Sequence, residues 1–231
     1  MSTHFTGKTD TFTSGTGEFR LSSLIRSWSR LSSRRQTSLE MDRGPEEVKL
    51  KVCMVGDAAV GKTSLVRRFV LDQFNDEYLS TFGAKVMTKD VPVENDSGEK
   101  VILKLLIWDI MGETSTLDKL GESYFRGAQG IVAVCDITRY TTLENLPVWF
   151  MAVEAFSGEV PAALAVNKID LKDKVIVVYE DHLVKQYASD IGAKAYMTSA
   201  RTGENVEEMF KTLAIDVYKR VHSRKVAPLP S

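Results

Sequence analysis

The chain has 231 residues, with 30 basic and 31 acidic side chains and a formal net charge of −1. This length suits one domain with an extension, and the balanced charge gives no overall basic field for nucleic acid. The only cysteines, Cys53 and Cys135, lie inside apolar runs, which argues against a disulfide framework and for a reducing compartment. Without a bilayer-spanning apolar run or a secretory signal, a soluble cytoplasmic protein is expected.

Composition divides the sequence into three parts. Residues 1–47 are rich in Ser, Thr, Gly and Arg and poor in aliphatic side chains, which predicts a disordered basic extension. Residues 48–222 alternate apolar runs with helical patterns, which predicts one folded domain. Residues 223–231 are predicted to form a short flexible tail.

Residues 19–35 have a pattern of their own within the extension. Apolar side chains recur at helical spacing and arginines lie among them, without an acidic residue: Leu21, Leu24, Ile25, Trp28 and Leu31, with Arg20, Arg26, Arg30, Arg34 and Arg35. Two interpretations stay open. One is an amphipathic helix that contacts an anionic membrane surface or a partner. The other is a disordered basic tail in which the apolar spacing is coincidental.

Strands and helices alternate through the rest of the chain. Strands are predicted at 49–55, 84–93, 101–109, 130–136, 162–167 and 194–198, and helices at 62–71, 115–126, 141–156, 180–191 and 204–221. Asn95-Asp96-Ser97-Gly98 carries turn chemistry, so the second and third strands are expected to form a hairpin. The remaining alternation predicts an α/β fold, a mostly parallel sheet with helices on both faces. Ligands of such sheets bind beyond the carboxyl ends of the strands.

The first strand and first helix of the domain are joined by a phosphate-binding pattern. Residues 56–64 read Gly-Asp-Ala-Ala-Val-Gly-Lys-Thr-Ser, which fits Gly, four residues, then Gly-Lys and Ser or Thr. The glycines permit tight turning and close approach to a ligand, and the turning backbone presents N–H groups to an anion. Lys62 can reach the outer phosphates, and the Thr63 hydroxyl can ligate Mg²⁺. The nucleotide-binding candidates here are Gly56, Asp57, Ala58, Ala59, Val60, Gly61, Lys62, Thr63 and Ser64.

The same helix continues with two arginines. We interpret Arg67 and Arg68 as part of a solvated helix face.

A third apolar strand ends in Asp109, which is expected to hold Mg²⁺ beside the phosphate loop, directly or through water. Gly112, three residues later, lets a backbone N–H approach the terminal phosphate.

Two later segments predict which nucleotide base is bound. Asn167-Lys168-Ile169-Asp170 follows a buried strand, and a carboxylate at Asp170 can accept both the ring N–H and the exocyclic amine of guanine. The stem of Lys168 can lie over the base plane, and Asn167 can tie this loop to the phosphate loop. Thr198-Ser199-Ala200-Arg201 follows the last strand, and the N–H groups of Ser199 and Ala200 are expected to donate to the guanine carbonyl.

In combination these motifs resemble the small GTPases of the Ras superfamily, and the Rab branch in particular. The supporting stretches are Gly-Asp-Ala-Ala-Val-Gly-Lys-Thr-Ser (56–64), Tyr-Leu-Ser-Thr-Phe-Gly (78–83), Ile-Trp-Asp (107–109), Tyr-Phe-Arg-Gly-Ala-Gln-Gly (124–130), Asn-Lys-Ile-Asp (167–170) and Thr-Ser-Ala (198–200). The resemblance covers about residues 48–221 and implies the Ras-like P-loop fold with a six-stranded sheet and five helices. It implies GTP and GDP as ligands, with effector, exchange-factor and activating proteins as partners. A monomer is expected.

The resemblance also implies roles for three residues of the first switch loop. Thr81 matches the threonine that binds Mg²⁺ only when the terminal phosphate is present. Phe74 matches the aromatic residue that packs against guanine, and Tyr78 matches the tyrosine that covers the phosphates. Loss of the terminal phosphate would release contacts to Thr81 and Gly112 together, which describes an order–disorder switch.

The chain departs from the family pattern after Asp109. The family usually has Thr-Ala-Gly-Gln there, whereas this chain has Ile110-Met111-Gly112-Glu113. An ionised Glu113 cannot donate to the transferring phosphoryl group, so slow hydrolysis is expected, with Lys62 and Gly112 as the other catalytic candidates. The competing hypothesis makes Glu113 a general base. Arg201 stands where the family often has Lys, with little effect expected.

Two other functions are weighed against a hydrolysing switch. A GTP-binding scaffold that hardly turns over is kept open by Glu113 and Met111. A phosphate-loop ATPase or kinase is disfavoured by Asn167-Lys168-Ile169-Asp170. The sequence ends in Lys225-Val-Ala-Pro-Leu-Pro-Ser231 without cysteine, so any peripheral membrane contact is expected to form without prenylation.

Overall fold

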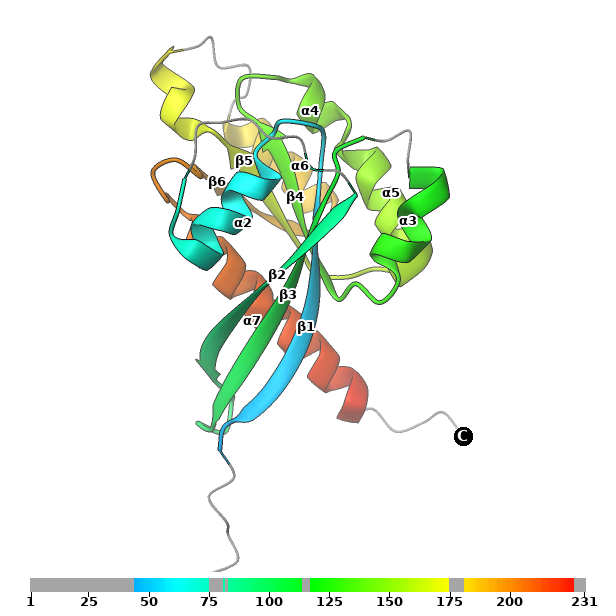
Figure 1. Cartoon of the computed structure of the whole chain (residues 1–231), viewed down its shortest axis with the longest axis vertical. Helices are drawn as coiled ribbons and strands as arrows, with labels where there is room; N and C mark the ends of the chain where they lie inside the picture. Colours follow the sequence, from blue (N-terminus) through cyan, green and yellow to red (C-terminus); the bar gives the residue numbers. More distant parts are fainter. Residues whose placement is uncertain (1–43, 75–80, 82, 114–116, 175–180, 227–231) are drawn as a thin grey trace, which may run out of the picture. The chain divides into compact units, whose positions relative to one another are not determined.

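The computed structural model describes residues 44–74, 81, 83–113, 117–174 and 181–226. They form a six-stranded sheet in the order β2-β3-β1-β4-β5-β6 (Figure 1). The strands are β1 (Glu46–Val55), β2 (Ala84–Glu94), β3 (Lys100–Ile110), β4 (Gly130–Asp136), β5 (Ala162–Asn167) and β6 (Ala193–Met197). The helices are α2 (Lys62–Leu71), α3 (Leu117–Phe125), α4 (Thr141–Glu144), α5 (Leu146–Ser157), α6 (Asp181–Asp190) and α7 (Val206–Val226), with a 3₁₀ helix at Ile169–Lys174.

The sheet is mostly parallel, as the alternation of elements predicts. β2 pairs with β3 in the antiparallel sense, and the other neighbouring strands are parallel. The hairpin turn follows from local chemistry: the Asn95 side-chain oxygen accepts the N–H groups of Ser97 and Glu99, and Gly98 adopts a φ of 77° that glycine tolerates. The predicted α/β fold and hairpin are therefore confirmed.

Two apolar clusters hold the helices against the two faces of the sheet. One cluster joins α2 and α7, where the rings of Phe69 and Phe210 stack with their centroids 4.3 Å apart. The other joins α3, α4, α5 and α6 around the buried Trp149, and α3 and α5 lie side by side (Figure 1). Since every residue of β4 is buried, its continuous apolar run suits a strand covered on both faces.

Most predicted boundaries lie within two residues of those in the structure, and three differences are larger. The helix predicted at 141–156 is split into α4 and α5, because Pro147 has no N–H to continue the first helix and instead occupies the opening turn of the second. β1 begins at Glu46, where it pairs with Val101 of β3. α7 continues to Val226, beyond the predicted end of the domain at residue 222.

Two sequence predictions lie in part or whole outside the described residues. The extension, including residues 19–35, precedes Gly44, and the tail is described only as far as Val226. Among the helices that the structure describes, none combines the length and apolar character needed to cross a bilayer.

Replacing one ring of the Phe69–Phe210 stack tests whether the packing between α2 and α7 stabilises the fold. Phe210 is 1% exposed, so Phe210→Ala is expected to lower the free energy of unfolding by about 3–5 kcal/mol through lost burial and a cavity. The matched control is Met151→Ala, because Met151 is 70% exposed and its change should stay within about 0.5 kcal/mol. Urea unfolding measures both, and equal effects would contradict the assigned core.

Candidate functional site

A cavity of about 480 Å³ lies where the predicted motifs meet. Its size falls within the range of about 300–1,000 Å³ typical of small-molecule sites. Five parts of the chain separated in sequence supply its wall: residues within Ala58–Arg67, then Gln73, Phe74 and Thr81, then Ile110–Glu113, then residues within Asn167–Leu171, and finally Ala200 and Arg201. The described phosphate-loop, β3-end and base-loop candidates are thus brought together at one edge of the sheet, as expected for the carboxyl ends of parallel strands.

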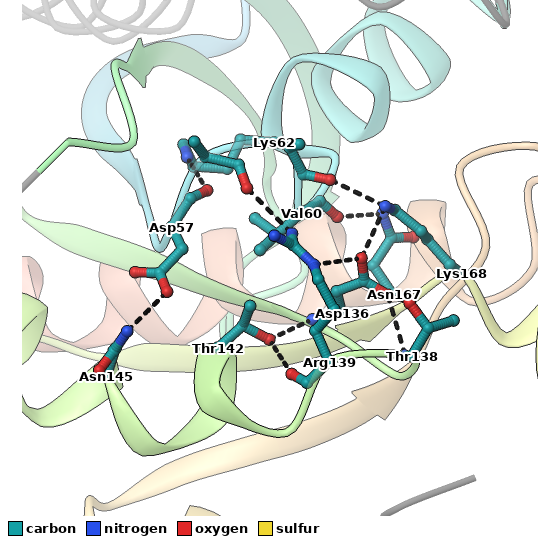
Figure 2. A network of polar contacts seen from close by, with 12 residues as sticks. Asp57, Val60, Lys62, Asp136, Thr138, Arg139, Thr142, Asn145, Asn167 and Lys168 are labelled. Atoms are coloured by element: carbon teal, nitrogen blue, oxygen red, sulfur yellow. Dashed lines mark hydrogen bonds and ion pairs between the residues drawn. The ribbon is translucent and has the colours of Figure 1, made fainter. Parts of the chain in front are cut away.

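Lys62 folds back over the first part of the phosphate loop. Its ammonium nitrogen donates to the carbonyl oxygen of Gly56 at 2.6 Å. It also donates to the carbonyl oxygen of Asp57 at 2.8 Å (Figure 2). Burial lowers the pKa of Lys62 to about 8, although the carboxylates of Asp109 and Asp57 oppose the shift. A partly desolvated ammonium group at this position is suited to bind an anion in the cavity.

The next three carbonyl groups of the loop are bound by side chains from other elements. Arg139 donates to Ala58 O at 2.9 Å, Lys168 to Ala59 O at 2.8 Å, and Asn167 to Val60 O at 2.9 Å (Figure 2). In contrast, the backbone N–H groups of residues 57–61 have no acceptor among the described residues. A loop whose carbonyl groups are occupied and whose N–H groups remain available favours an anionic ligand.

Asp136 organises two of these three donors, and sequence reasoning missed it. The carboxylate is 1% exposed; one oxygen accepts from Lys168 at 2.7 Å and Arg139 at 3.0 Å, and the other accepts from Thr138. Burial alone would raise the pKa of Asp136, but the hydrogen bonds from Lys168 and Thr138 outweigh it and the pKa lies below its usual value. Its position at the end of β4, equivalent to that of Asp109 on β3, was the available signal.

The Asp57 side chain anchors the loop on the side of α5. Its carboxylate accepts from Asn145 Nδ2 at 2.8 Å and Trp149 Nε1 at 3.1 Å. The Asp57 backbone belongs to the phosphate loop as predicted, whereas its carboxylate bonds to Asn145 and Trp149 and so attaches the loop to this side of the fold. Asn145 and Trp149 carry no motif, so sequence reasoning could not identify them.

The three predicted metal ligands meet beside Lys62. Thr63 Oγ1 donates to Asp109 Oδ2 at 2.5 Å and lies 2.9 Å from Thr81 Oγ1, and Thr81 is 3.5 Å from the same carboxylate oxygen. Burial raises the pKa of Asp109, and the hydrogen bonds and the charge of Lys62 oppose the shift only in part. The other oxygen, Asp109 Oδ1, is buried and has no hydrogen-bond partner among the described residues. Two hydroxyl groups and a carboxylate with an unsatisfied oxygen form a donor set that fits Mg²⁺.

The segment after Asp109 packs closely on the phosphate loop. A Cβ atom on Gly112 would lie 2.5 Å from Ala58 N and 2.6 Å from Asp57 O, so only glycine permits this approach. Glu113 is exposed at the cavity wall.

The candidate base-binding loops are held to each other by side chains. Ser199 Oγ donates to Asp170 Oδ1 at 2.6 Å, which fixes the carboxylate predicted to read the base. The Ala200 N–H, predicted to meet the guanine carbonyl, donates here to Asn167 Oδ1 at 3.2 Å. The Ser199 N–H donates to the carbonyl of Glu204.

Arg68 does not belong to a solvated face, so the prediction is wrong for this arginine. Arg68 donates to Ala200 O at 2.9 Å and Arg201 O at 2.6 Å, and Arg67 lines the cavity. Helical spacing alone could not identify these neighbours, since they lie across the fold. Phe74 lines the cavity as expected, while Tyr78 lies outside the described residues.

Replacing Asp136 and measuring stability at several pH values tests whether its ionised carboxylate holds the phosphate loop in place. Because its folded-state pKa is lowered, the ionised carboxylate stabilises the fold above its ordinary pKa, and this contribution is lost as the pH falls through the folded value. Asp136→Asn is expected to lower the free energy of unfolding by about 1–3 kcal/mol at neutral pH, towards the lower end because Arg139 is partly solvated.

Urea unfolding of both proteins across acidic to neutral pH measures this difference, which should narrow as the pH falls. The control is Asp216→Asn, which removes an exposed pair with Lys194 and should cost less than about 1 kcal/mol. A difference that stays constant with pH would contradict an ionised anchor.

The chain matches known proteins over most of its length. The model of the Ras family matches residues 51–219. Ras-related protein Rab-31 from Rattus norvegicus and from Homo sapiens are each 38% identical over 182 residues, which cover 78% of this chain and 85% of each relative. GTP-binding protein ypt5 of Schizosaccharomyces pombe is 38% identical over 168 residues, covering 72% of this chain and 77% of that protein. The chain therefore belongs to the Ras family and is a Rab-like small GTPase.

Proposed function

We propose that the chain is a switch that binds GTP or GDP together with Mg²⁺ and hydrolyses GTP slowly. The observation that carries this proposal is the meeting of three groups of residues around one cavity. They are the phosphate loop with free N–H groups, the Thr63–Thr81–Asp109 cluster, and the loop that contains Asn167 and Asp170. A hydrolysis-poor GTP-binding scaffold is the second candidate, favoured by Glu113 at the cavity wall.

The phosphate end of the ligand is bound by the loop and by Lys62. The N–H groups of residues 57–61 donate to phosphate oxygens, and the start of α2 adds the favourable field of a helix N-terminus. Lys62 exchanges contacts with loop carbonyl groups for contacts with the outer phosphates. Thr63, Thr81 and Asp109 hold Mg²⁺, which when bound neutralises negative charge on the phosphates.

The guanine end is bound by the two loops at the ends of β5 and β6. Asp170 accepts the ring N–H and the exocyclic amine, and its bond from Ser199 supports the orientation required. Lys168 and Phe74 contact the two sides of the base. Ala200 releases its bond to Asn167 to donate to the guanine carbonyl, with Ser199 and Arg201 beside it.

Switching follows from residues that contact the terminal phosphate. Thr81 and Gly112 lie in the two loops that flank the phosphate loop. Loss of the terminal phosphate removes contacts from both loops together and changes the surface that effectors read, at about 74–84 and 110–126. Exchange factors and activating proteins are the expected regulators, and Tyr78 is proposed to cover the phosphates.

Glu113 governs the rate in this proposal. An ionised carboxylate cannot donate to the transferring phosphoryl group, and its charge opposes that of the phosphates. Lys62 and Gly112 supply the remaining stabilisation through an ammonium and a backbone N–H group.

The test of this proposal is to identify the nucleotide that co-purifies with the chain and to follow bound GTP in a single turnover. We expect guanine nucleotide in the purified protein and slow loss of bound GTP. The Glu113→Gln variant should hydrolyse GTP about a hundredfold faster, which corresponds to an activation free energy lower by about 2.7 kcal/mol. The control Glu159→Gln removes an exposed charge on the loop after α5 and should leave the rate unchanged.

Adenine nucleotide in the purified protein would contradict the assigned base. A Glu113→Gln variant no faster than the unaltered chain would instead favour Glu113 as a general base. GTP that persists in both proteins would favour the scaffold.

We also infer peripheral membrane contact through residues 19–35. Chains with and without residues 1–43 can be compared by co-sedimentation with anionic vesicles, a truncation that leaves β1 whole. Stronger binding by the longer chain is expected from its arginines and apolar side chains. Equal binding would overturn this inference.

A further inference from the structure

Two neighbouring arginines on α2 have very different surroundings. The Arg68 side chain is bonded to other residues of the protein: it donates to the carbonyl groups of Ala200 and Arg201 and forms an ion pair with Asp72. Arg67 is partly buried on the cavity wall. Within the part of the chain that the structure describes, the Arg67 side chain has neither a hydrogen bond nor an ion pair.

The position of Arg67 on α2 directs it towards the same ligand as the phosphate-loop residues. It lies three residues after Ser64 and four after Thr63, and residues at these spacings share one face of a helix. Helical side chains also point back towards the N-terminus of their helix, which for α2 is the phosphate loop. Arg67, Ser64 and Thr63 accordingly all line the cavity.

None of the other charged groups of the described wall, Glu113 included, forms an ion pair with Arg67. Lys62 and Lys168 already bond to loop carbonyl groups, and Arg201 is exposed to solvent. Asp170 accepts from Ser199. The wall residues on the adjoining segments, Gln73, Phe74 and Thr81, carry no charge.

A partly buried guanidinium group without an acceptor is unfavourable until a ligand supplies one. Phosphate oxygens are well matched to it, because the planar fork of arginine forms strong, charge-assisted hydrogen bonds to them. We propose that Arg67 is an additional phosphate-binding residue, which donates from α2 to the phosphate chain of the bound nucleotide. This inference rests on the proposed function, since it assumes a nucleotide in this cavity.

Arg67 is expected to differ from an arginine that contacts only the terminal phosphate. α2 is a fixed helix packed on the sheet through Leu65 and Phe69, and its contact with the ligand does not depend on either switch loop. Arg67 should therefore contribute to binding of GDP and GTP alike. It adds positive charge in a site where Glu113 adds negative charge.

The experiment compares Arg67→Gln, Arg67→Lys and the unaltered chain for binding of GDP and of a non-hydrolysable GTP analogue, at low and moderate salt. Arg67→Gln should weaken binding of both nucleotides by roughly tenfold or more, Arg67→Lys should weaken both less, and the loss should shrink as salt rises. The matched control is Arg220→Gln, which removes an arginine of α7 that bonds to Glu159 away from the cavity. Its affinities should match those of the unaltered chain.

Affinities of Arg67→Gln that equal those of the control would overturn the inference while leaving the proposed function intact. Weakened binding of the GTP analogue alone would also overturn it, because the contact would then belong to the terminal phosphate. Failure of the unaltered chain to bind either nucleotide would instead overturn the proposed function. Arg67→Lys retains the charge and the long stem, so it keeps the test valid if Arg67→Gln folds poorly.

Discussion

The site depends on how the carbonyl groups of the phosphate loop are occupied. Five consecutive carbonyl groups, from Gly56 to Val60, each accept a hydrogen bond from a side chain. Since a peptide unit directs its N–H opposite to its C=O, binding the carbonyl groups on one side leaves N–H groups for the other. Apart from Lys62, the donors come from the ends of β4 and β5, so the loop takes its shape from the sheet.

The same side chains connect the phosphate end of the cavity to the base end. The Asn167 amide donates to Val60 O and accepts from the Ala200 N–H, while Arg68 reaches from α2 to the carbonyl groups of Ala200 and Arg201. Two loops that would otherwise be independent are thereby held in one arrangement. Asp136 adds a buried charge that fixes Lys168 between them, which rigidifies the site without contributing to the cavity wall.

Much of the fold was predictable because its signals are local. The apolar runs predicted each strand, Asn95 to Gly98 predicted the hairpin, and the spacing within residues 56–64 predicted the phosphate loop. The helix predicted at 141–156 failed at Asn145, where the apolar pattern continues although Pro147 cannot donate the next hydrogen bond. Arg68 was misassigned because helical spacing indicates a face of a helix but not what lies opposite that face.

The sequence by itself determined the order of the elements, the kind of chemistry at each motif and the departure at Glu113, since these depend on residues close together in the chain. Only the tertiary structure decided which side chains support the site. Arg139, Lys168 and Trp149 contact the phosphate loop from 81 to 109 residues away. Contacts at such separations arise when the parallel strands align their carboxyl ends, and no local pattern encodes that alignment.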